Sequence, residues 1–293
     1  MSHIAKKSMG QNFLKSEPAL KMMCQAGEVN KEDIILEIGP GKGALTVKLL
    51  EQAGRVIAVE KDRDLIETLE DKFKDEIKNK KLILLNQDIL TLNLRGVFLN
   101  LLNGLTPFPS PSSEDLKEIS KTHQEDFNYK IIANIPYNIT GAIIKKFLSE
   151  EIQPSHMVLL VQKEVAERIV ARDGKESILS LSVKAYGIPK YMMKVHKRFF
   201  SPSPKVDSAI ISISSISNKN FLSKDDEKSF FDIIKAAFAH KRKVLRKNLE
   251  SLGHKQEFID QMFLNLKIDS KTRAEDLSFS IWLEIKKHLS KKI

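Results

Sequence analysis

Residues 31–54 read KEDIILEIGPGKGALTVKLLEQAG. The apolar run at 34–38 ends in Gly39 and predicts a short buried strand. Apolar residues at helical spacing follow over 44–54, and Gly54 marks the end of that helix. Between the two elements, three glycines at alternate positions predict a tight turn. The stretch therefore predicts a strand, a glycine turn and a helix, which together make the first half of a βαβ unit.

Strand and helix patterns continue to alternate beyond this stretch. Strands that alternate with helices form parallel sheets whose two faces are both covered. The last two apolar runs follow each other closely and indicate an antiparallel pair. The predicted fold class is therefore α/β, a Rossmann-like sheet of seven mostly parallel strands. The predicted strands are 31–39, 55–60, 81–90, 129–137, 156–162, 190–199 and 205–214.

Two segments interrupt the alternation. Residues 91–128 contain TPFPSPSS, whose three prolines and three serines exclude regular structure, so we predict an insertion there. The polar stretch 214–220 predicts a domain linker. Beyond the linker, apolar residues recur at three, four or seven positions, which predicts a helix that ends at Gly253. We therefore predict two domains, residues 1–216 and a smaller, all-helical domain at 217–293.

The composition is that of an ordinary globular protein. Hydrophobic residues make up 42% of the 293 residues and charged residues 29%. The apolar runs are far shorter than the roughly 20 residues of a membrane-spanning helix. The N-terminus lacks the apolar region of a secretory signal, and a single cysteine excludes an intramolecular disulfide. We expect a cytoplasmic, monomeric protein that binds no membrane and no metal.

The charge is strongly positive, since 48 Lys and Arg face 38 Asp and Glu and give +10. Such an excess points to a polyanion, most simply nucleic acid, although many basic proteins bind none. Residues 219–293 hold 17 Lys and Arg and 11 Asp and Glu, which is more than half of the excess. Interleaved apolar positions predict that a basic cluster there shares one helical flank, which would contact phosphates; a solvated helix face is the alternative. The predicted RNA-binding residues are Lys241, Arg242, Lys243, Arg246 and Lys247.

The glycine turn, EIGPGKG at 37–43, predicts a ligand site, because Gly39 and Gly41 let the backbone approach a ligand closely. Its spacing differs from the GxGxxG of dinucleotide enzymes. An acid two residues before the first glycine is instead typical of loops that bind S-adenosylmethionine; another nucleotide or a plain turn remains an alternative. Glu60 and Asp88 close the next two predicted strands. Carboxylates there can accept hydrogen bonds from the ribose hydroxyls and the adenine amino group of that cofactor.

A second turn, Asn134-Ile135-Pro136-Tyr137, follows the fourth predicted strand. It resembles the [N/D/S]-P-P-[Y/F/W] signature of methyltransferases that act on exocyclic amines. The Asn134 side-chain oxygen and the Ile135 carbonyl could accept hydrogen bonds from an adenine amino group and orient its lone pair. Tyr137 could stack on an extruded adenine. The alternative is a buried turn with a core tyrosine.

Together these motifs resemble the KsgA family of small-subunit rRNA adenine N6,N6-dimethyltransferases. Residues 10–14, GQNFL, match the N-terminal element of that family. The resemblance implies that Gln11, Asn12 and Leu14 border the cofactor, together with Asn134. It also implies that residues 238–249 form the family's basic helix.

Residues 199–209, FFSPSPKVDSA, match the family element F-x-P-x-P-K-V-D-S-A. The resemblance implies that Phe200 is a second aromatic wall, which sandwiches the adenine against Tyr137; a core phenylalanine is the alternative.

The implied reaction is S-adenosylmethionine-dependent dimethylation of two adjacent adenines near the 3′ end of small-subunit rRNA, within a pre-assembled subunit. One alternative is an Erm-type enzyme that methylates large-subunit rRNA. Another is a non-catalytic RNA-binding or transcription factor on the same fold. The GQNFL element and the basic tail favour the small-subunit enzyme, and the cofactor residues argue against lost catalysis.

Overall fold

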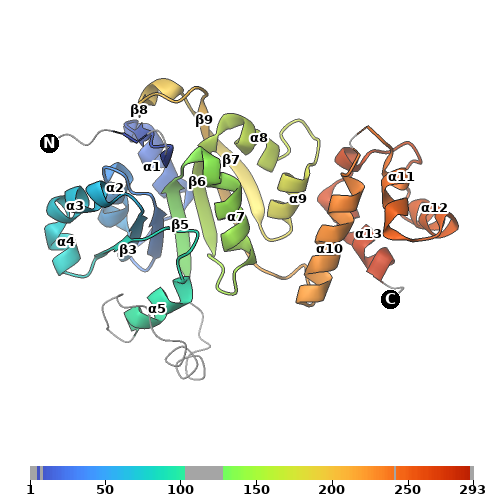
Figure 1. Cartoon of the computed structure of the whole chain (residues 1–293), viewed down its shortest axis with the longest axis horizontal. Coiled ribbons are helices and arrows are strands. Elements are labelled where there is room, and N and C mark those ends of the chain that lie inside the picture. Colours follow the sequence, from blue (N-terminus) through green and yellow to red (C-terminus); the bar gives the residue numbers. More distant parts are fainter. Residues whose placement is uncertain (1–4, 7–8, 103–127, 241, 291–293) are drawn as a thin grey trace. The chain divides into compact units, whose positions relative to one another are not determined.

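The computed structural model describes residues 5–6, 9–102, 128–240 and 242–290 (Figure 1). The chain divides into two compact units. One comprises Met1–Lys163 and Met192–Ser214, and the other comprises Glu164–Tyr191 and Ser215–Ile293. This division differs from the predicted single boundary after residue 216, because residues 164–191 group with the C-terminal helices.

The first unit is built on the predicted seven-stranded sheet, whose strand order is β4-β3-β2-β5-β6-β9-β7. Each neighbouring pair from β4 to β6 is parallel, and β9 runs antiparallel to β6. The predicted α/β class and its seven strands are therefore confirmed. The strands are β2 (Ile34–Ile38), β3 (Arg55–Glu60), β4 (Leu82–Asn86), β5 (Tyr129–Asn134), β6 (His156–Gln162), β7 (Ile188–Val195) and β9 (Ser208–Ser214).

Helices follow most of the parallel strands and bury their apolar faces against the sheet. The helix α1 precedes the sheet; the Ser16 hydroxyl caps its start by accepting a hydrogen bond from the Ala19 N–H. Its buried residues join a core cluster that reaches into β2, β3, β5, β6 and β9. The helices of this part are α1 (Glu17–Ala26), α2 (Ala44–Gln52), α3 (Arg63–Lys72), α4 (Lys74–Lys78), α5 (Leu94–Leu102) and α7 (Thr140–Ser149).

The helical segment after β3 is divided into α3 and α4 at Phe73, which is buried. The Phe73 ring fills the space beside the glycine turn: a Cβ added to Gly43 would lie 2.6 Å from it. Gly43 also has φ +73°, a left-handed conformation that side chains disfavour. Packing of Phe73 therefore requires glycine at position 43 and holds the turn that leads into α2.

A small two-stranded sheet was not predicted. The strands β1 (Phe13–Leu14) and β8 (Phe200–Ser201) pair antiparallel, with Phe13 opposite Ser201 and Leu14 opposite Phe200. The Lys15 N–H also donates to the Phe199 carbonyl at 2.8 Å. This sheet fastens the N-terminal segment to the loop before β9.

The second unit is mainly helical and also includes the start of β7, residues 188–191. Tyr186 explains why residues 164–191 belong to it, because its ring stacks 6.1 Å from that of Phe231 and its hydroxyl donates to Glu227 at 2.5 Å. Lys175 likewise pairs with Asp276 at 2.7 Å. The helices are α8 (Lys163–Ile169), which begins at the last residue of the first unit, α9 (Ile178–Lys184), α10 (Lys224–Ala237), α11 (Leu245–Leu249), α12 (Gln256–Asn265) and α13 (Phe279–Ser290).

The prediction of one helix that ends at Gly253 is wrong in its middle part, where the chain leaves the helical conformation. The helix α10 ends at Ala237, and α11 begins only at Leu245. The predicted end is correct, since Gly253 follows a 3-10 turn with φ +82°. Of the predicted insertion at 91–128, α5 forms the start, and residues 103–127 lie outside the described residues. No helix in the described ranges is long and apolar enough to cross a membrane.

Candidate active site

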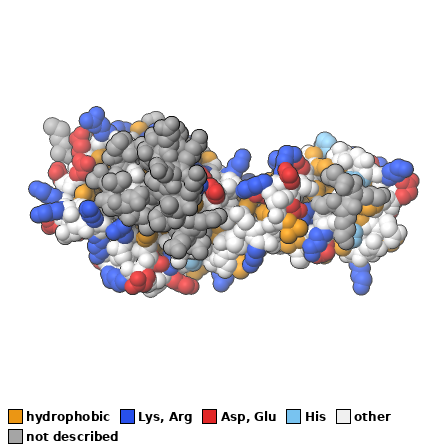
Figure 2. Space-filling model, turned by 90° about the horizontal axis from the view of Figure 1, so that it is seen from below, with side chains coloured by type: hydrophobic (Ala, Val, Ile, Leu, Met, Phe, Trp, Pro, Cys, Tyr) orange, Lys and Arg blue, Asp and Glu red, His pale blue; other side chains and the backbone are white. Residues whose placement is uncertain are grey.

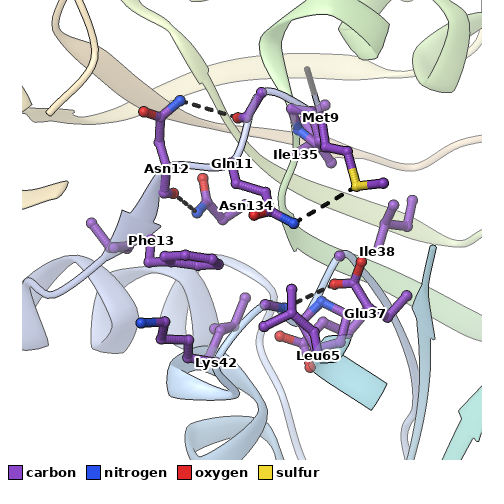
Figure 3. A pocket seen from close by; sticks show the side chains of 18 of the residues that line it. Met9, Gln11, Asn12, Phe13, Glu37, Ile38, Lys42, Leu65, Asn134 and Ile135 are labelled. Atoms are coloured by element: carbon purple, nitrogen blue, oxygen red, sulfur yellow. Dashed lines mark hydrogen bonds between the residues drawn. The ribbon is translucent and has the colours of Figure 1, made fainter. Parts of the chain in front are cut away.

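A cavity of about 920 Å³ opens in the first unit where β2, β3 and β5 end (Figure 3). Its volume suits a small-molecule ligand, and the carboxyl ends of parallel strands are where open α/β sheets bind ligands. Most of the site residues predicted from the sequence lie on its wall. These are Gln11, Asn12, Leu14, Gly39, Gly41, Glu60, Asp88, Asn134, Pro136 and Tyr137.

The glycine turn forms one side of the cavity. Gly39 has φ +66°, and a Cβ added there would meet no atom within 4 Å, so the backbone is open to a ligand at this point. Gly41 has φ +59°, and its added Cβ would lie 2.9 Å from the Phe13 ring. Phe13 therefore packs directly on the turn, and this contact was missed by the sequence reasoning. The Lys42 ammonium lies 5.0 Å from the centre of the same ring.

Glu60 connects the glycine turn to the loop after β3. Its carboxylate accepts hydrogen bonds from the Gly41 N–H at 3.2 Å and from the Asp62 N–H at 2.9 Å. Burial raises the pKa of this carboxyl, and the backbone donors partly offset that effect. Each carboxylate oxygen keeps further lone-pair capacity that a ligand hydroxyl could use.

Glu37 is the acid before the first glycine, and its side chain is 1% exposed at the end of β2. Burial raises the pKa of its carboxyl to about 8, and the nearby Glu60 carboxylate adds to the rise. Its Oε2 atom has no hydrogen-bond partner among the described residues. A cationic ligand group beside such a buried carboxyl would stabilise its ionised form.

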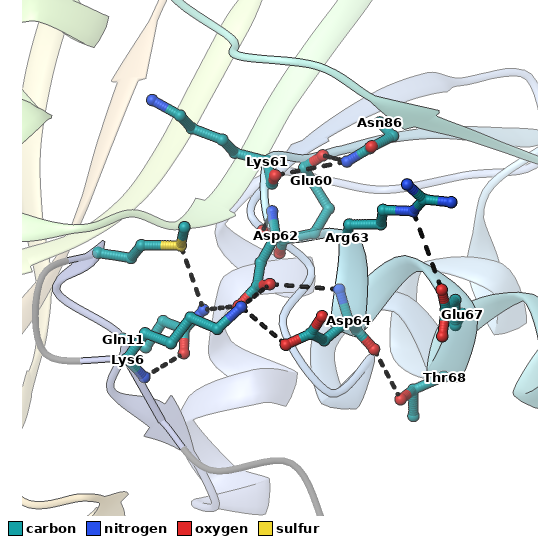
Figure 4. A network of polar contacts seen from close by, with 11 residues as sticks. Lys6, Gln11, Glu60, Lys61, Asp62, Arg63, Asp64, Glu67, Thr68 and Asn86 are labelled. Atoms are coloured by element: carbon teal, nitrogen blue, oxygen red, sulfur yellow. Dashed lines mark hydrogen bonds and ion pairs between the residues drawn. The ribbon is translucent and has the colours of Figure 1, made fainter.

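Asp62 fastens the N-terminal segment over the cavity, and the sequence reasoning missed it (Figure 4). Its side chain accepts from the Lys6 ammonium at 2.6 Å and from the Gln11 amide at 2.7 Å. Burial alone would raise the pKa of Asp62, but these hydrogen bonds hold the pKa below its usual value. Its place two residues after Glu60, as the N-cap of α3, was the available signal. The network positions Gln11 at the cavity wall.

Asp88 lies two residues beyond β4 rather than at its end. Its Oδ2 pairs with the Lys61 ammonium at 2.8 Å, and its Oδ1 accepts from the Leu90 N–H at 2.9 Å. These partners lower the pKa of the carboxyl, the Lys61 hydrogen bond most of all. Asp88 is thus an ionised acceptor that is held in a fixed orientation at the cavity wall.

The NIPY turn, residues 134–137, starts at the last residue of β5. The Asn134 amide donates to the Asn12 carbonyl at 3.1 Å (Figure 3). This hydrogen bond fixes which way the amide points and leaves its oxygen to accept from a ligand. Pro136 follows with φ −59° and packs close to Gly10. The two N-terminal residues Gly10 and Asn12 thus support the turn from one side.

Tyr137 is held from the other side of the turn. Its hydroxyl forms a 2.6 Å hydrogen bond with that of Ser208, the fully buried first residue of β9. Burial raises the pKa of Tyr137, so the phenol is neutral at ordinary pH. Its ring is partly exposed and lines the cavity.

Phe200 does not lie where the resemblance implied. Its side chain is 5% exposed and belongs to the core cluster that also contains Leu14 and Ile210. It is absent from the residues that line the cavity. The alternative of a core phenylalanine therefore describes its placement, because the pairing of β8 with β1 turns this residue inward.

The predicted basic cluster does not form one helical flank. Lys241 lies outside the described residues, and Arg242 and Lys243 are exposed in the loop between α10 and α11. In α11, Arg246 pairs with Asp260 at 2.6 Å, while Lys247 is exposed. On the face shown in Figure 2, the described Lys and Arg side chains lie among Asp and Glu.

Comparison with known proteins gives a consistent family. The chain matches the family described as ribosomal RNA adenine dimethylase over residues 2–291. It is 36% identical over 282 residues to "Ribosomal RNA small subunit methyltransferase A" of Fusobacterium nucleatum, with 96% of both chains covered. The protein of the same name from Nostoc sp. is 36% identical over 287 residues, again with 96% of both chains covered.

Two solved structures share the fold. A dimethyladenosine transferase from Plasmodium falciparum has a TM-score of 0.73 at 24% identity, with 96% of this chain and 98% of that chain covered. The 23S rRNA methyltransferase ErmE has a TM-score of 0.71 at 21% identity, with 95% and 100% covered. The match of the family over nearly the whole sequence, with the identity to full-length relatives, shows that the chain belongs to the ribosomal RNA adenine dimethylase family.

Proposed function

We propose that the protein uses S-adenosylmethionine to dimethylate the N6 amino groups of two adjacent adenines near the 3′ end of small-subunit rRNA. The observation that carries this proposal is the NIPY turn at the cavity edge, with the Asn134 amide oriented by the Asn12 carbonyl. The names of the relatives from Fusobacterium nucleatum and Nostoc sp. support the small subunit as the substrate. The proposed setting is the cytoplasm, and a monomeric state stays a prediction that sedimentation would test.

The described cavity residues fit the cofactor. The open backbone at Gly39 leaves room for a ligand beside the turn, and the Oε2 atom of Glu37 suits the cationic amine of a methionyl group. Glu60 has acceptor capacity for ribose hydroxyls, and Asp88 for an adenine amino group. Bound there, the sulfonium group supplies an electrophilic methyl for transfer.

The residues of the NIPY turn would prepare the adenine amine. Its lone pair is delocalised into the ring, so the nitrogen is a poor nucleophile. Hydrogen bonds to the Asn134 oxygen and the Ile135 carbonyl would favour a tetrahedral nitrogen and aim its lone pair at the methyl group. Tyr137 would stack on the extruded base. A strong base is unnecessary, because the amine becomes acidic only after it has gained the methyl group.

The direct test supplies the purified protein and labelled S-adenosylmethionine to three substrates: unmethylated small subunits, unmethylated large subunits and free rRNA. We expect N6,N6-dimethyladenosine in the small-subunit rRNA, which nuclease digestion and mass spectrometry would detect. Label confined to large-subunit RNA would overturn the proposed substrate and support the Erm-type alternative. Cofactor binding without any transfer would support the non-catalytic alternative.

Cofactor binding should release a proton from Glu37. At pH 7 its carboxyl is mostly protonated in the unliganded protein, because its pKa is about 8. A cationic amine beside it lowers that pKa, so the proton leaves on binding; well above pH 8 it has already left. Calorimetric titration in buffers of different ionisation enthalpy would measure the release at pH 7 and at pH 9.5. Glu37→Gln should abolish it, and equal release by this variant would contradict the assignment.

Loss of the Ser208 hydroxyl should slow transfer through Tyr137. A hydrogen bond of this kind is worth about 0.5–1.5 kcal/mol, so we expect Ser208→Ala to lower the single-turnover rate up to about tenfold. Tyr137→Phe removes the same hydrogen bond and serves as the partner variant. The double variant should then lose little more than either single one. If the rate losses of the two single variants multiply in the double variant, Ser208 acts on something other than Tyr137.

A further inference from the structure

The loop between β7 and β9, residues 196–207, carries cations that the predicted RNA-binding set leaves out; we refer to it as the cationic loop. It contains Lys197, Arg198 and Lys205, and its one acid is Asp207. The charge reasoning from the sequence placed the RNA contact in residues 219–293 instead. The whole cationic loop belongs to the first unit, which also contains the cavity.

Asp207 is used to hold the loop rather than to neutralise its exposed cations. It accepts from the Lys197 N–H at 3.0 Å and pairs with the Lys194 ammonium at 3.0 Å. Its own carbonyl accepts from the Lys163 N–H at 3.0 Å. No described carboxylate lies within 4.0 Å of the charged groups of Lys197, Arg198 or Lys205. These three exposed cations are therefore available to an anionic partner.

Arg198 and Phe199 add a flat surface to this charge. The guanidinium lies 5.1 Å from the centre of the Phe199 ring, and that side chain is 36% exposed. Stacked guanidinium and aromatic groups are the surfaces on which unpaired bases bind, whereas duplex RNA hides its bases. Exposed Val206 adds apolar area next to Lys205.

The cationic loop is joined to the active site on two sides. At its start, the Phe199 carbonyl accepts from Lys15, and the β8 residues pair with Phe13 and Leu14 of the cavity wall. At its end, the next residue is Ser208, which hydrogen-bonds the Tyr137 hydroxyl. An RNA strand bound to this loop would therefore lie next to the turn that would receive the base.

We propose that Arg198 and Phe199, with Lys197 and Lys205, form a docking platform for the single-stranded RNA that flanks the target adenine. The platform binds one unpaired base by stacking and the adjoining phosphates by charge. This inference rests on the proposed function, since it takes rRNA as the substrate. It assigns a strand-positioning role to the loop, in addition to any phosphate contacts of the C-terminal unit.

The test uses the full chain and a fluorescently labelled single-stranded oligoribonucleotide of about 12 nucleotides, with a duplex of equal length. We expect Phe199→Ala to weaken single-strand binding about tenfold and Phe199→Trp to retain it, with tryptophan fluorescence quenched by RNA. Lys197→Glu and Lys205→Glu should each lower the slope of log affinity against log salt by about 1. Lys74→Glu and Lys78→Glu, on exposed positions of α4, are the matched charge controls.

All variants should bind S-adenosylmethionine as the unaltered protein does, and their KM for the RNA substrate should rise more than kcat falls. If the cationic-loop variants bind the single-stranded RNA with the same affinity as the α4 control variants, the proposed platform is wrong, even if the protein methylates small subunits. If the unaltered protein binds the single strand through these residues but methylates no rRNA, the platform stands and the proposed function fails. An equal loss of duplex and single-strand binding would also count against it, because it would indicate charge without stacking.

Discussion

Asn134→Ala should reduce methyl transfer by about 10³-fold while the protein remains folded. The amide oxygen of Asn134 is the side-chain acceptor that the NIPY turn offers to an adenine amine, and its direction is fixed by the 3.1 Å hydrogen bond to the Asn12 carbonyl. Alanine removes both the acceptor and the orienting donor. A group that is pre-positioned for the transition state contributes mainly to the rate rather than to ground-state binding. Single-turnover transfer to small subunits, with cofactor affinity measured in parallel, would separate the two effects.

Asn134→Asp is the informative control. It keeps an acceptor of the same size but loses the N–H donor, and its charge would face the Asn12 carbonyl that the amide now contacts. We expect its activity to lie well below that of the unaltered protein, because the acceptor is no longer held in place. Full activity of Asn134→Ala would exclude the proposed mechanism, and full activity of Asn134→Asp would exclude the orienting role of Asn12.

Glu60→Ala should weaken cofactor binding by about 100-fold. The carboxylate is the acceptor for the N–H groups of Gly41 and Asp62, and it also has capacity for ribose hydroxyls. Hydrogen bonds to charged groups are worth about 1.5–3 kcal/mol. The loss of this acceptor should therefore raise the Kd for the cofactor by up to about 100-fold. Equilibrium titration with the cofactor measures the change. Turnover at saturating cofactor should fall much less.

Two controls distinguish binding from folding. Glu60→Gln keeps one oxygen acceptor, so we expect a smaller loss than for alanine. Glu67→Ala, on the exposed face of α3, removes a carboxylate from the same part of the chain and should leave cofactor affinity unchanged. If Glu60→Ala binds the cofactor as tightly as Glu67→Ala does, the end of β3 does not contribute to the cofactor site.

The sheet and the cavity wall could be predicted because each depends on local sequence. A buried parallel strand is a short apolar run, and the glycine turn requires left-handed conformations at Gly39, Gly41 and Gly43. Glu60 and Asn134 end their strands, so the topology alone brings them to one edge of the sheet. These residues could be placed together without knowledge of any distant contact.

Phe199 and Phe200 show where local reasoning fails. Phe199 ends a 3-10 turn and Phe200 begins β8, and only one of the two rings is buried in the core. The sequence does not tell which, because the choice depends on the pairing of β8 with the distant strand β1. The resemblance implied that Phe200 is the second aromatic wall against the adenine, whereas the structure buries Phe200 and exposes Phe199.

The helix break in the second unit has a similar cause. Phe238 and Leu245 are seven residues apart, a step that a continuous helix would also produce, so periodicity cannot reveal the loop between α10 and α11. Asp62 was missed for a different reason. Its role depends on the distant partners Lys6 and Gln11, which lie in a segment without helical or strand periodicity.

The pairing of β1 with β8 also has a consequence for how the protein is made. Phe13 and Leu14 cannot find their strand partners until residue 201 has been synthesised. At typical elongation rates, the growing chain therefore waits about 10 to 40 s with its N-terminal strand unpaired. Such long-range pairing is also slow to form, because a large loop must close first. We expect nascent chains to acquire the first parallel strands early and to become competent for the cofactor only after residue 201 has been synthesised.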